Sequence, residues 1–158
     1  MDKIAIKRTN RCDTRVLKKG EVLTKEAVET DTLYHREAVN KCGEALVKKL
    51  TDQFKEHDHT KLGKYLPAFT EALSTGFKGK EFKGQDWWKI HLTERHHLND
   101  RVPEDVNLID VLEMICDCVS AGMARSGKVF DLEIPSFILE EAVANTVKML
   151  IKSIEVID

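Results

Sequence analysis

The stretch LIDVLEMICDCVSAGMA, residues 108–124, decides the fold that we predict for this chain. Apolar side chains cover most of its sides, and its length corresponds to about five helical turns. The preceding RVPEDVN, residues 101–107, carries the turn and capping residues that mark a helix start. Small residues near its end, Ser120 to Ala124, would allow another helix to approach closely. The stretch therefore predicts a long helix within a packed bundle.

Helical patterns continue on both sides of this stretch. Upstream we predict a helix capped by Asp31 or Thr32 that runs to about Phe54, a short helix opened by Pro67, and a helix over 86–96, with a Gly/Lys loop over 76–85. Downstream, a connector over 126–135 leads to a last helix that begins near Pro135 or Ser136. Its apolar positions recur at helical spacing: Leu139, Val143, Val147, Leu150 and Ile154.

The whole chain is therefore predicted to be all-α, a bundle of about five helices over residues 26–158. A short extended N-terminal arm, residues 1–25, precedes it, and KIAIK at 3–7 alternates like a short strand.

Composition places the chain among cytoplasmic globular proteins. Of 158 residues, 42% are hydrophobic and 33% charged, a balance that excludes a disordered tail. The net charge of −2 does not indicate binding to duplex DNA or to an anionic membrane. No apolar run approaches the roughly 20 residues that a membrane-spanning helix needs. MDKIAIKRTNRCDTR lacks the apolar centre of a signal peptide. Four cysteines without a CxxC pair indicate reduced thiols rather than disulfides.

All six histidines fall between positions 35 and 97, and imidazole commonly binds transition metals. His35 lies on a predicted helix, the doublet His57-Asp58 follows 22 residues later, and Asp117 lies on a later helix. This order resembles the HD-domain superfamily of metal-dependent phosphohydrolases. The resemblance implies a helical bundle in which these four residues bind one divalent metal and leave positions open for water and substrate.

Longer motifs resemble a narrower family. HDHTKL at 57–62, WW..H...RHHL at 87–98 and P.DVNLID.LEMI.D....AGMARSG at 103–127 are similar to small phage-encoded HD-like proteins without an assigned reaction. The similarity spans about residues 9–155. It implies a phage origin, hence the host cytoplasm, and an HD-type site, and it leaves the substrate open.

The stretch WWKIHLTERHH, residues 87–97, carries three of the histidines. On a straight helix His91 and Arg95 share a face, whereas His96 and His97 point about 140° and 120° away from His91. The three can form a second metal site only if the helix ends near Arg95, as the following LNDRVP indicates. The two tryptophans fit core or interface packing, with base stacking as the alternative.

Asp117 belongs to a narrow polar stripe on the helix over 108–124, formed by Asp110, Glu113, Asp117 and Ser120. The stripe faces either water or a wet active-site cleft, and Asp110 fits a helix cap. With the upstream histidines present, Asp117 is the predicted metal ligand and Glu113 the alternative.

These patterns predict an HD-type phosphohydrolase that acts on a small nucleotide phosphoester. His35, His57, Asp58 and Asp117 would bind Mn, Fe, Ni, Co or Zn, with one ion expected and a second at His91, His96 and His97. Lys61 and Arg95 would contact phosphoryl oxygens, and His91 would act as an acid or bind the second ion. The alternative is a non-catalytic HD-like protein that binds a host protein or sequesters a nucleotide. A homo-oligomer is compatible with either.

Overall fold

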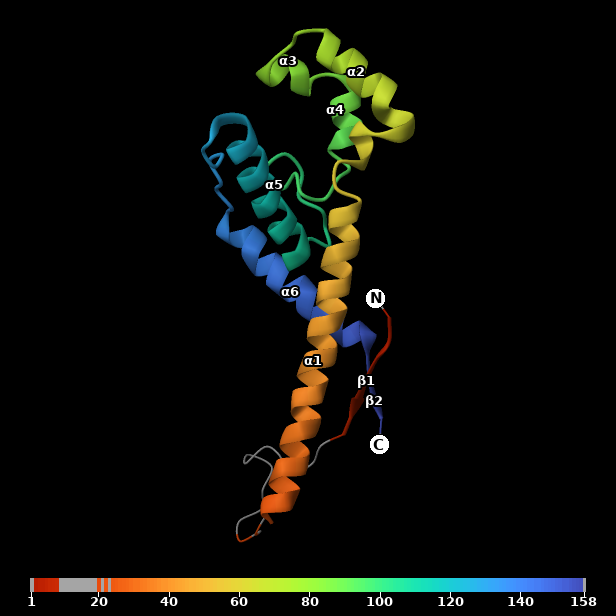
Figure 1. Ribbon diagram of the computed structural model, residues 1–158, viewed down its shortest axis with the longest axis vertical. Helices are drawn as coiled ribbons and strands as arrows, with labels where there is room; N and C mark the ends of the chain where they lie inside the picture. Colours follow the sequence, from red (N-terminus) through yellow and green to blue (C-terminus); the bar gives the residue numbers. More distant parts are fainter. Residues whose placement is uncertain (1, 9–19, 21, 23, 158) are drawn as a thin grey trace. The chain divides into compact units, whose positions relative to one another are not determined.

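The computed structural model describes residues 2–8, 20, 22 and 24–157 of the chain (Figure 1). Most of these residues are helical, which confirms the all-α prediction. No described helix is both long and apolar enough to cross a membrane. In chain order the elements are β1 (Ile4–Lys7), α1 (Lys25–Lys55), the 3₁₀ turns η1 (His59–Lys61) and η2 (Gly63–Tyr65), α2 (Leu66–Ser74), α3 (Gly79–Lys83), α4 (Asp86–His91), α5 (Leu108–Ser126), α6 (Ser136–Ser153) and β2 (Ile154–Ile157).

The chain forms two compact units. One contains residues 1–49 and 147–158, and the other contains residues 50–146. Residues 1, 9–19, 21 and 23 of the predicted N-terminal arm lie outside the described part of the chain. The predicted domain boundary at residue 25 stays a prediction.

The first unit pairs two short strands that are distant in sequence. β1 and β2 run parallel, with Ile4 opposite Ile154 and Lys7 opposite Ile157. Ile4 is buried, and the Lys41 ammonium of α1 donates to the carbonyl of Ala5 at 3.1 Å. The predicted strand at KIAIK is therefore confirmed. Ile154 is predicted as helical but instead begins β2, because it pairs with Ile4. This partner is too distant in sequence for a local pattern to indicate the pairing.

α1 begins earlier than its predicted cap. The Thr24 hydroxyl accepts a hydrogen bond from the backbone N–H of Ala27 at 3.2 Å, so Thr24 caps the helix that starts at Lys25. Asp31 and Thr32 lie inside the helix, and the Thr32 hydroxyl donates back to the carbonyl of Val28. This corrects the predicted start.

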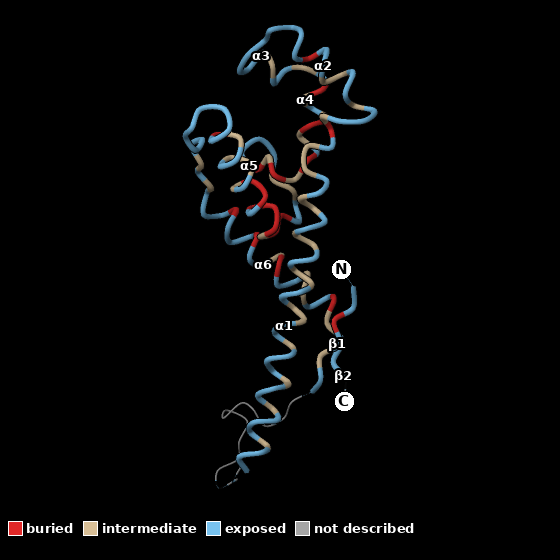
Figure 2. The backbone as a smooth tube through the Cα atoms, viewed as in Figure 1, coloured by how far each residue is buried: buried red, intermediate tan, exposed pale blue. Residues whose placement is uncertain are grey.

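The second unit has its core where α5 meets the first part of α6. Figure 2 shows buried residues concentrated along the N-terminal half of α5 and the segment before it. The buried apolar residues that pack together in this core are Leu98, Val106, Val111, Met114, Ile138 and Ala142. A capping box starts α5, since the Asn107 side chain accepts from Ile109 N–H while the Asp110 carboxylate accepts from Asn107 N–H. The long central helix and its predicted start are confirmed.

Two local predictions upstream of α5 are wrong. The Gly/Lys segment at 76–85 contains the one-turn helix α3 rather than loop alone. α4 ends at His91 instead of position 96, and the chain continues in turns. Its next residues bind different elements: Glu94 bonds to the turn at Asp58, and Arg95 bonds to the start of α5. These two sets of hydrogen bonds prevent α4 from continuing beyond His91.

Gly122 allows a backbone crossing rather than a helix–helix contact. A Cβ at this position would lie 2.5 Å from the Lys128 carbonyl oxygen and 2.6 Å from the Phe130 nitrogen. The connector after α5 therefore folds back directly against the helix, where the Phe130 N–H donates to the carbonyl of Cys118 at 3.4 Å.

Replacing Gly122 with alanine is expected to lower the free energy of unfolding by about 1–3 kcal/mol, because the added methyl group overlaps backbone that has no rotamer to change. Gly43→Ala is the matched control, since Gly43 is also helical and has open space around its Cβ position. The control is expected to stabilise by up to about 1 kcal/mol. Urea unfolding followed by circular dichroism measures both. Equal effects at the two glycines would contradict the close backbone crossing.

Candidate metal centre

The His57-Asp58 doublet lies in the turn that follows α1, and Glu94 fixes the shape of that turn. Asp58 adopts a left-handed conformation with φ of 59°, which aspartate tolerates better than most residues. Its backbone N–H donates to Glu94 Oε2 at 2.7 Å, and the N–H of Thr60 donates to Glu94 Oε1 at 2.9 Å. The Thr60 hydroxyl donates to the same oxygen. Glu94 thus holds the doublet in place from the segment after α4.

Trp87 and Thr60 position His91. The indole N–H of Trp87 donates to the Thr60 carbonyl at 2.9 Å, and its ring stacks on His91 with centroids 4.7 Å apart. Nδ1 of His91 lies 2.7 Å from the Thr60 hydroxyl oxygen, which leaves Nε2 directed at the other histidines. Trp87 is buried and also packs on Phe69. The core-packing interpretation therefore holds for this tryptophan.

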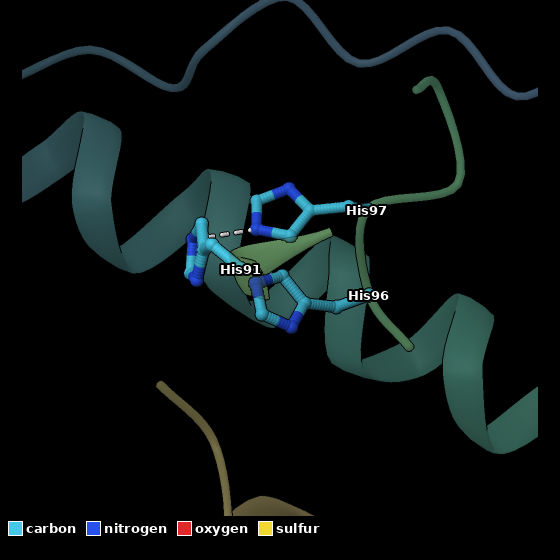
Figure 3. Close-up of side chains that lie close together, drawn as sticks. All are labelled: His91, His96 and His97. Atoms are coloured by element: carbon cyan, nitrogen blue, oxygen red, sulfur yellow. Dashed lines mark hydrogen bonds between the residues drawn. The ribbon is translucent and has the colours of Figure 1, made fainter. Parts of the chain in front are cut away.

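Because α4 ends at His91, the three histidines of the 87–97 stretch converge. Figure 3 shows the rings of His91, His96 and His97 turned toward one another. Nε2 of His97 lies 2.7 Å from Nε2 of His91, and the centroids of the His96 and His97 rings are 4.1 Å apart. The early helix end satisfies the condition under which these residues were predicted to share a site.

His57 joins this group from the other side and is surrounded by carboxylates. Its Nδ1 donates to Glu113 Oε1 at 2.9 Å, while Nε2 lies 3.5 Å from Asp117 Oδ1 and 3.7 Å from Asp58 Oδ2. Its ring centroid is 4.3 Å from that of His96. The doublet and the histidine cluster therefore form one continuous site, which we call the metal centre: His57, Asp58, His91, Glu94, His96 and His97.

A buried polar network supports the metal centre from α5. Gln53 donates through Nε2 to Glu113 Oε2 at 2.7 Å and to Asp110 Oδ1 at 2.8 Å. Asp110 is fully buried and also accepts from Arg95 Nε at 2.7 Å and Nη2 at 2.8 Å. The Arg95 guanidinium additionally donates to Asp105 Oδ1 at 3.0 Å. Arg95 thus connects the histidine segment to α5.

Hydrogen bonding and burial set the charges at the site. Hydrogen bonds to Asp117 and Glu113 raise the pKa of His57 to about 10, against the effect of burial. Burial would raise the pKa of Glu113, but hydrogen bonds from His57 and Gln53 lower it to about 2. For Glu94, burial is likewise outweighed by hydrogen bonds from His91 and Thr60, and its pKa lies well below the usual range. Burial, with the neighbouring His96 and His91, lowers the pKa of His97 to about 3.

The residues of this site include ligand types that could hold a metal ion. Nδ1 of His96 is buried without a hydrogen bond, and the buried Oδ1 of Asp58 lies 2.7 Å from the Lys61 ammonium. Three groups of ligand atoms within 4.8 Å of one another occur among the described residues: His91, His96 and His97; His57, Asp58 and His96; and Asp58, His91 and Glu94. Buried His, Asp and Glu side chains could therefore hold a metal ion here.

The structure brings together some predicted site residues and not others. His57, Asp58, His91, His96 and His97 converge, whereas Asp117 contacts His57 but belongs to none of the three ligand groups. His35 lies in α1 within the other unit, with an exposed side chain, and its role as a ligand stays a prediction. Lys61 pairs with Asp58, and Arg95 pairs with Asp110.

Sequence reasoning gave no role to Glu94, Thr60 or Gln53. Glu94 had one available signal, because it lies three residues after His91 and so on the same helical side. No local signal identifies Thr60 or Gln53, whose side chains bond to residues 31 or more positions away.

The stability of the metal-free protein is expected to be greatest near pH 6.5. Below that value an unfolded His97 takes up a proton while the folded one, with a pKa of about 3, stays neutral, so stability falls by up to about 1.4 kcal/mol per pH unit. Above it, the stability from the raised pKa of His57 is lost as the pH rises toward about 10.

Urea unfolding of chelator-treated protein between pH 4.5 and 6.5 tests the His97 contribution, since carboxylates with lowered pKa values affect stability mainly below 4.5. His97→Gln is expected to flatten the slope in this window. A wild-type slope of zero there would contradict the buried neutral His97.

Comparison with known proteins identifies one related family. The profile of a family described as a Family of unknown function (DUF5662) matches residues 24–154, a region that contains the whole metal centre. No curated protein and no solved structure matches the chain.

Proposed function

We propose, on the premise that this chain belongs to the DUF5662 family of unknown function, that it is a metal-dependent hydrolase of small phosphoesters. One observation carries the proposal: each of Asp58, His91 and His96 belongs to two of the three groups of convergent ligand atoms. Shared ligands of this kind suit one ion or two adjacent ions.

The proposed ligands are His57, Asp58, His91, His96 and His97, a set of imidazoles with one carboxylate that suits Mn, Fe, Ni, Co or Zn. A bound ion would supply Lewis acidity toward water and a phosphoryl oxygen. Glu94 is the weaker candidate as a ligand, because its two oxygens already accept three hydrogen bonds from Asp58 and Thr60. We assign Glu94 the role of holding the turn at Asp58 in a fixed position relative to His91.

Two cations predicted to contact phosphate receive different roles. Lys61 lies 2.7 Å from the Asp58 carboxylate, and part of its side chain is exposed. We assign its ammonium to contact with a phosphoryl oxygen at the edge of the site. Arg95 forms a bidentate ion pair with buried Asp110, and it therefore supports the site by connecting the histidine segment to α5. Trp87, stacked on His91, excludes water from that side.

A relationship to HD-domain phosphohydrolases and, through the longer motifs, a phage origin are part of the proposal. Of the four residues that carry the HD resemblance, the His57-Asp58 doublet, which follows a long helix, belongs to the groups of convergent ligand atoms. A small nucleotide is the proposed substrate class.

A non-catalytic binding role is the second candidate. It is favoured by two close ionic hydrogen bonds within the site. Asp58 already pairs with Lys61, and His57 already pairs with Glu113. A site satisfied in this way would hold its shape without turnover.

The proposal is tested by measuring bound metal and phosphate release on purified protein. Wild-type protein loaded with Mn or Zn is expected to bind metal stoichiometrically and to release phosphate from members of a nucleotide panel. Asp58→Ala is expected to lower turnover by more than about 100-fold, since it removes a ligand rather than an outer contact.

Asp86→Ala is the control, because the Asp86 side chain is 95% exposed on α4 outside the site. Stoichiometric metal without turnover on any nucleotide would favour the binding role. Protein that binds no metal at all would overturn the metal centre.

A further inference from the structure

A pocket of about 210 Å³ opens beside the metal centre, and the proposed chemistry does not use it. Its lining comes from one face of α5 and from the residues at and just after the end of α1: Phe54, His57, Glu113, Cys116, Asp117 and Ser120. His57 belongs both to this lining and to the metal centre. A group bound in the pocket would therefore lie next to the reacting part of the substrate.

Asp117 provides an available charged hydrogen-bond acceptor in this pocket. Both oxygens of Glu113 are engaged, Oε1 by His57 at 2.9 Å and Oε2 by Gln53 at 2.7 Å, and its side chain is 5% exposed. The side chain of Asp117 is 30% exposed, and its Oδ1 lies 3.5 Å from Nε2 of His57. Its carboxylate can therefore accept hydrogen bonds from a ligand.

Charge and size restrict what the pocket can take. Two carboxylates face a single imidazole across the lining, so a phosphate there would be repelled. An apolar cavity of about 150 Å³ holds benzene, so this slightly larger pocket accommodates one or two fused rings rather than a whole nucleotide. Phe54 offers an aromatic surface for such a ring.

We infer that this pocket binds an amino-substituted aromatic heterocycle of the substrate, with Asp117 accepting a hydrogen bond from its amino group. The inference rests on the proposed function, because it places the ring on one side of His57 and the phosphoester at the metal centre. Asp117 becomes a specificity-determining residue and not a metal ligand. This assignment agrees with its absence from the three ligand groups of the described residues.

The test compares nucleosides that differ by one amino group. Metal-loaded protein labelled with ¹⁵N is titrated with cytidine against uridine and with adenosine against inosine, and dissociation constants are taken from amide chemical shifts. The amino member of each pair is expected to bind about tenfold or more tightly, because a hydrogen bond to a charged group is gained and the oxo member faces the carboxylate with an acceptor. The shifts are expected to centre on residues 113–120.

Asp117→Asn is expected to abolish this selectivity, since an amide offers both a donor and an acceptor. Asp86→Asn, at the exposed position on α4, is the matched control and is expected to retain it. Wild-type selectivity is measured without any variant, so a misfolded Asp117→Asn protein would not prevent the test.

Equal binding of amino and oxo nucleosides, or no binding of either, would overturn the inference, as would selectivity that survives in Asp117→Asn. Nucleosides contain no phosphoester, so binding is read independently of turnover. Selective binding without phosphate release from any nucleotide would therefore support the pocket and overturn the hydrolase. Phosphate release without selectivity would do the reverse.

Discussion

Asp110→Ala is expected to lower the free energy of unfolding by about 3–5 kcal/mol, the effect of removing one partner from a buried ion pair. The Asp110 side chain is fully buried and accepts five hydrogen bonds. Two come from the Arg95 guanidinium, two from the backbone and side-chain nitrogens of Asn107, and one from Gln53. Its loss leaves these donors without an acceptor in a region that water does not reach.

Asp105→Ala is the matched control, because Asp105 contacts the same Arg95 guanidinium at 3.0 Å with a side chain that is 79% exposed. The control is expected to cost less than about 1 kcal/mol, as exposed ion pairs usually do. Urea unfolding of both variants, followed by circular dichroism at pH 7, measures the difference. If the two substitutions cost the same, Asp110 is not the centre of the network.

The second large effect is expected for His96→Ala, which should weaken metal binding by more than about 100-fold. His96 is buried, belongs to two of the three ligand groups, and carries a ring nitrogen without a hydrogen-bond partner. A metal that binds only the folded protein at 1,000 times its dissociation constant stabilises it by about 4 kcal/mol. Thermal unfolding of the wild type should therefore shift upward on adding Mn or Zn, and the variant should be stabilised by no more than about 1.4 kcal/mol at the same metal concentration.

His59→Ala provides the control for this experiment. His59 follows the same doublet but is 46% exposed and belongs to none of the three ligand groups. This variant is expected to keep the metal-induced shift. If His96→Ala keeps the shift as well, the metal binds elsewhere or is held without His96.

Local patterns were sufficient for the long helices of this fold. α5 follows directly from an apolar stretch behind a capping box, and α6 begins at Ser136 as expected after Pro135. Two of the failures, at α4 and at Ile154, occurred where partners distant in sequence determine the conformation. α4 stops at His91 because Glu94 and Arg95 bond to other elements, and Ile154 becomes a strand residue because Ile4 pairs with it.

The same distinction between local patterns and distant partners applies to the candidate site. The His57-Asp58 doublet was identified by its position, and the three later histidines by a condition on where their helix ends. On α5, helical phase placed Glu113 and Asp117 in one stripe, about 40° apart, and the upstream histidines made Asp117 the predicted metal ligand and Glu113 the alternative. The structure separates them: Glu113 is buried against His57 and Gln53, while Asp117 remains partly exposed.

The parallel pairing of β1 with β2 has a consequence for biosynthesis. Ile4 and Ile154 are 150 residues apart, so at about 5–20 residues per second the first strand waits roughly 8–30 s for its partner to be translated. Residues 50–146 leave the ribosome within that interval and can bury their core before the strands meet. An edge strand that stays unpaired for so long is a site for chaperone binding or for mispairing between nascent chains.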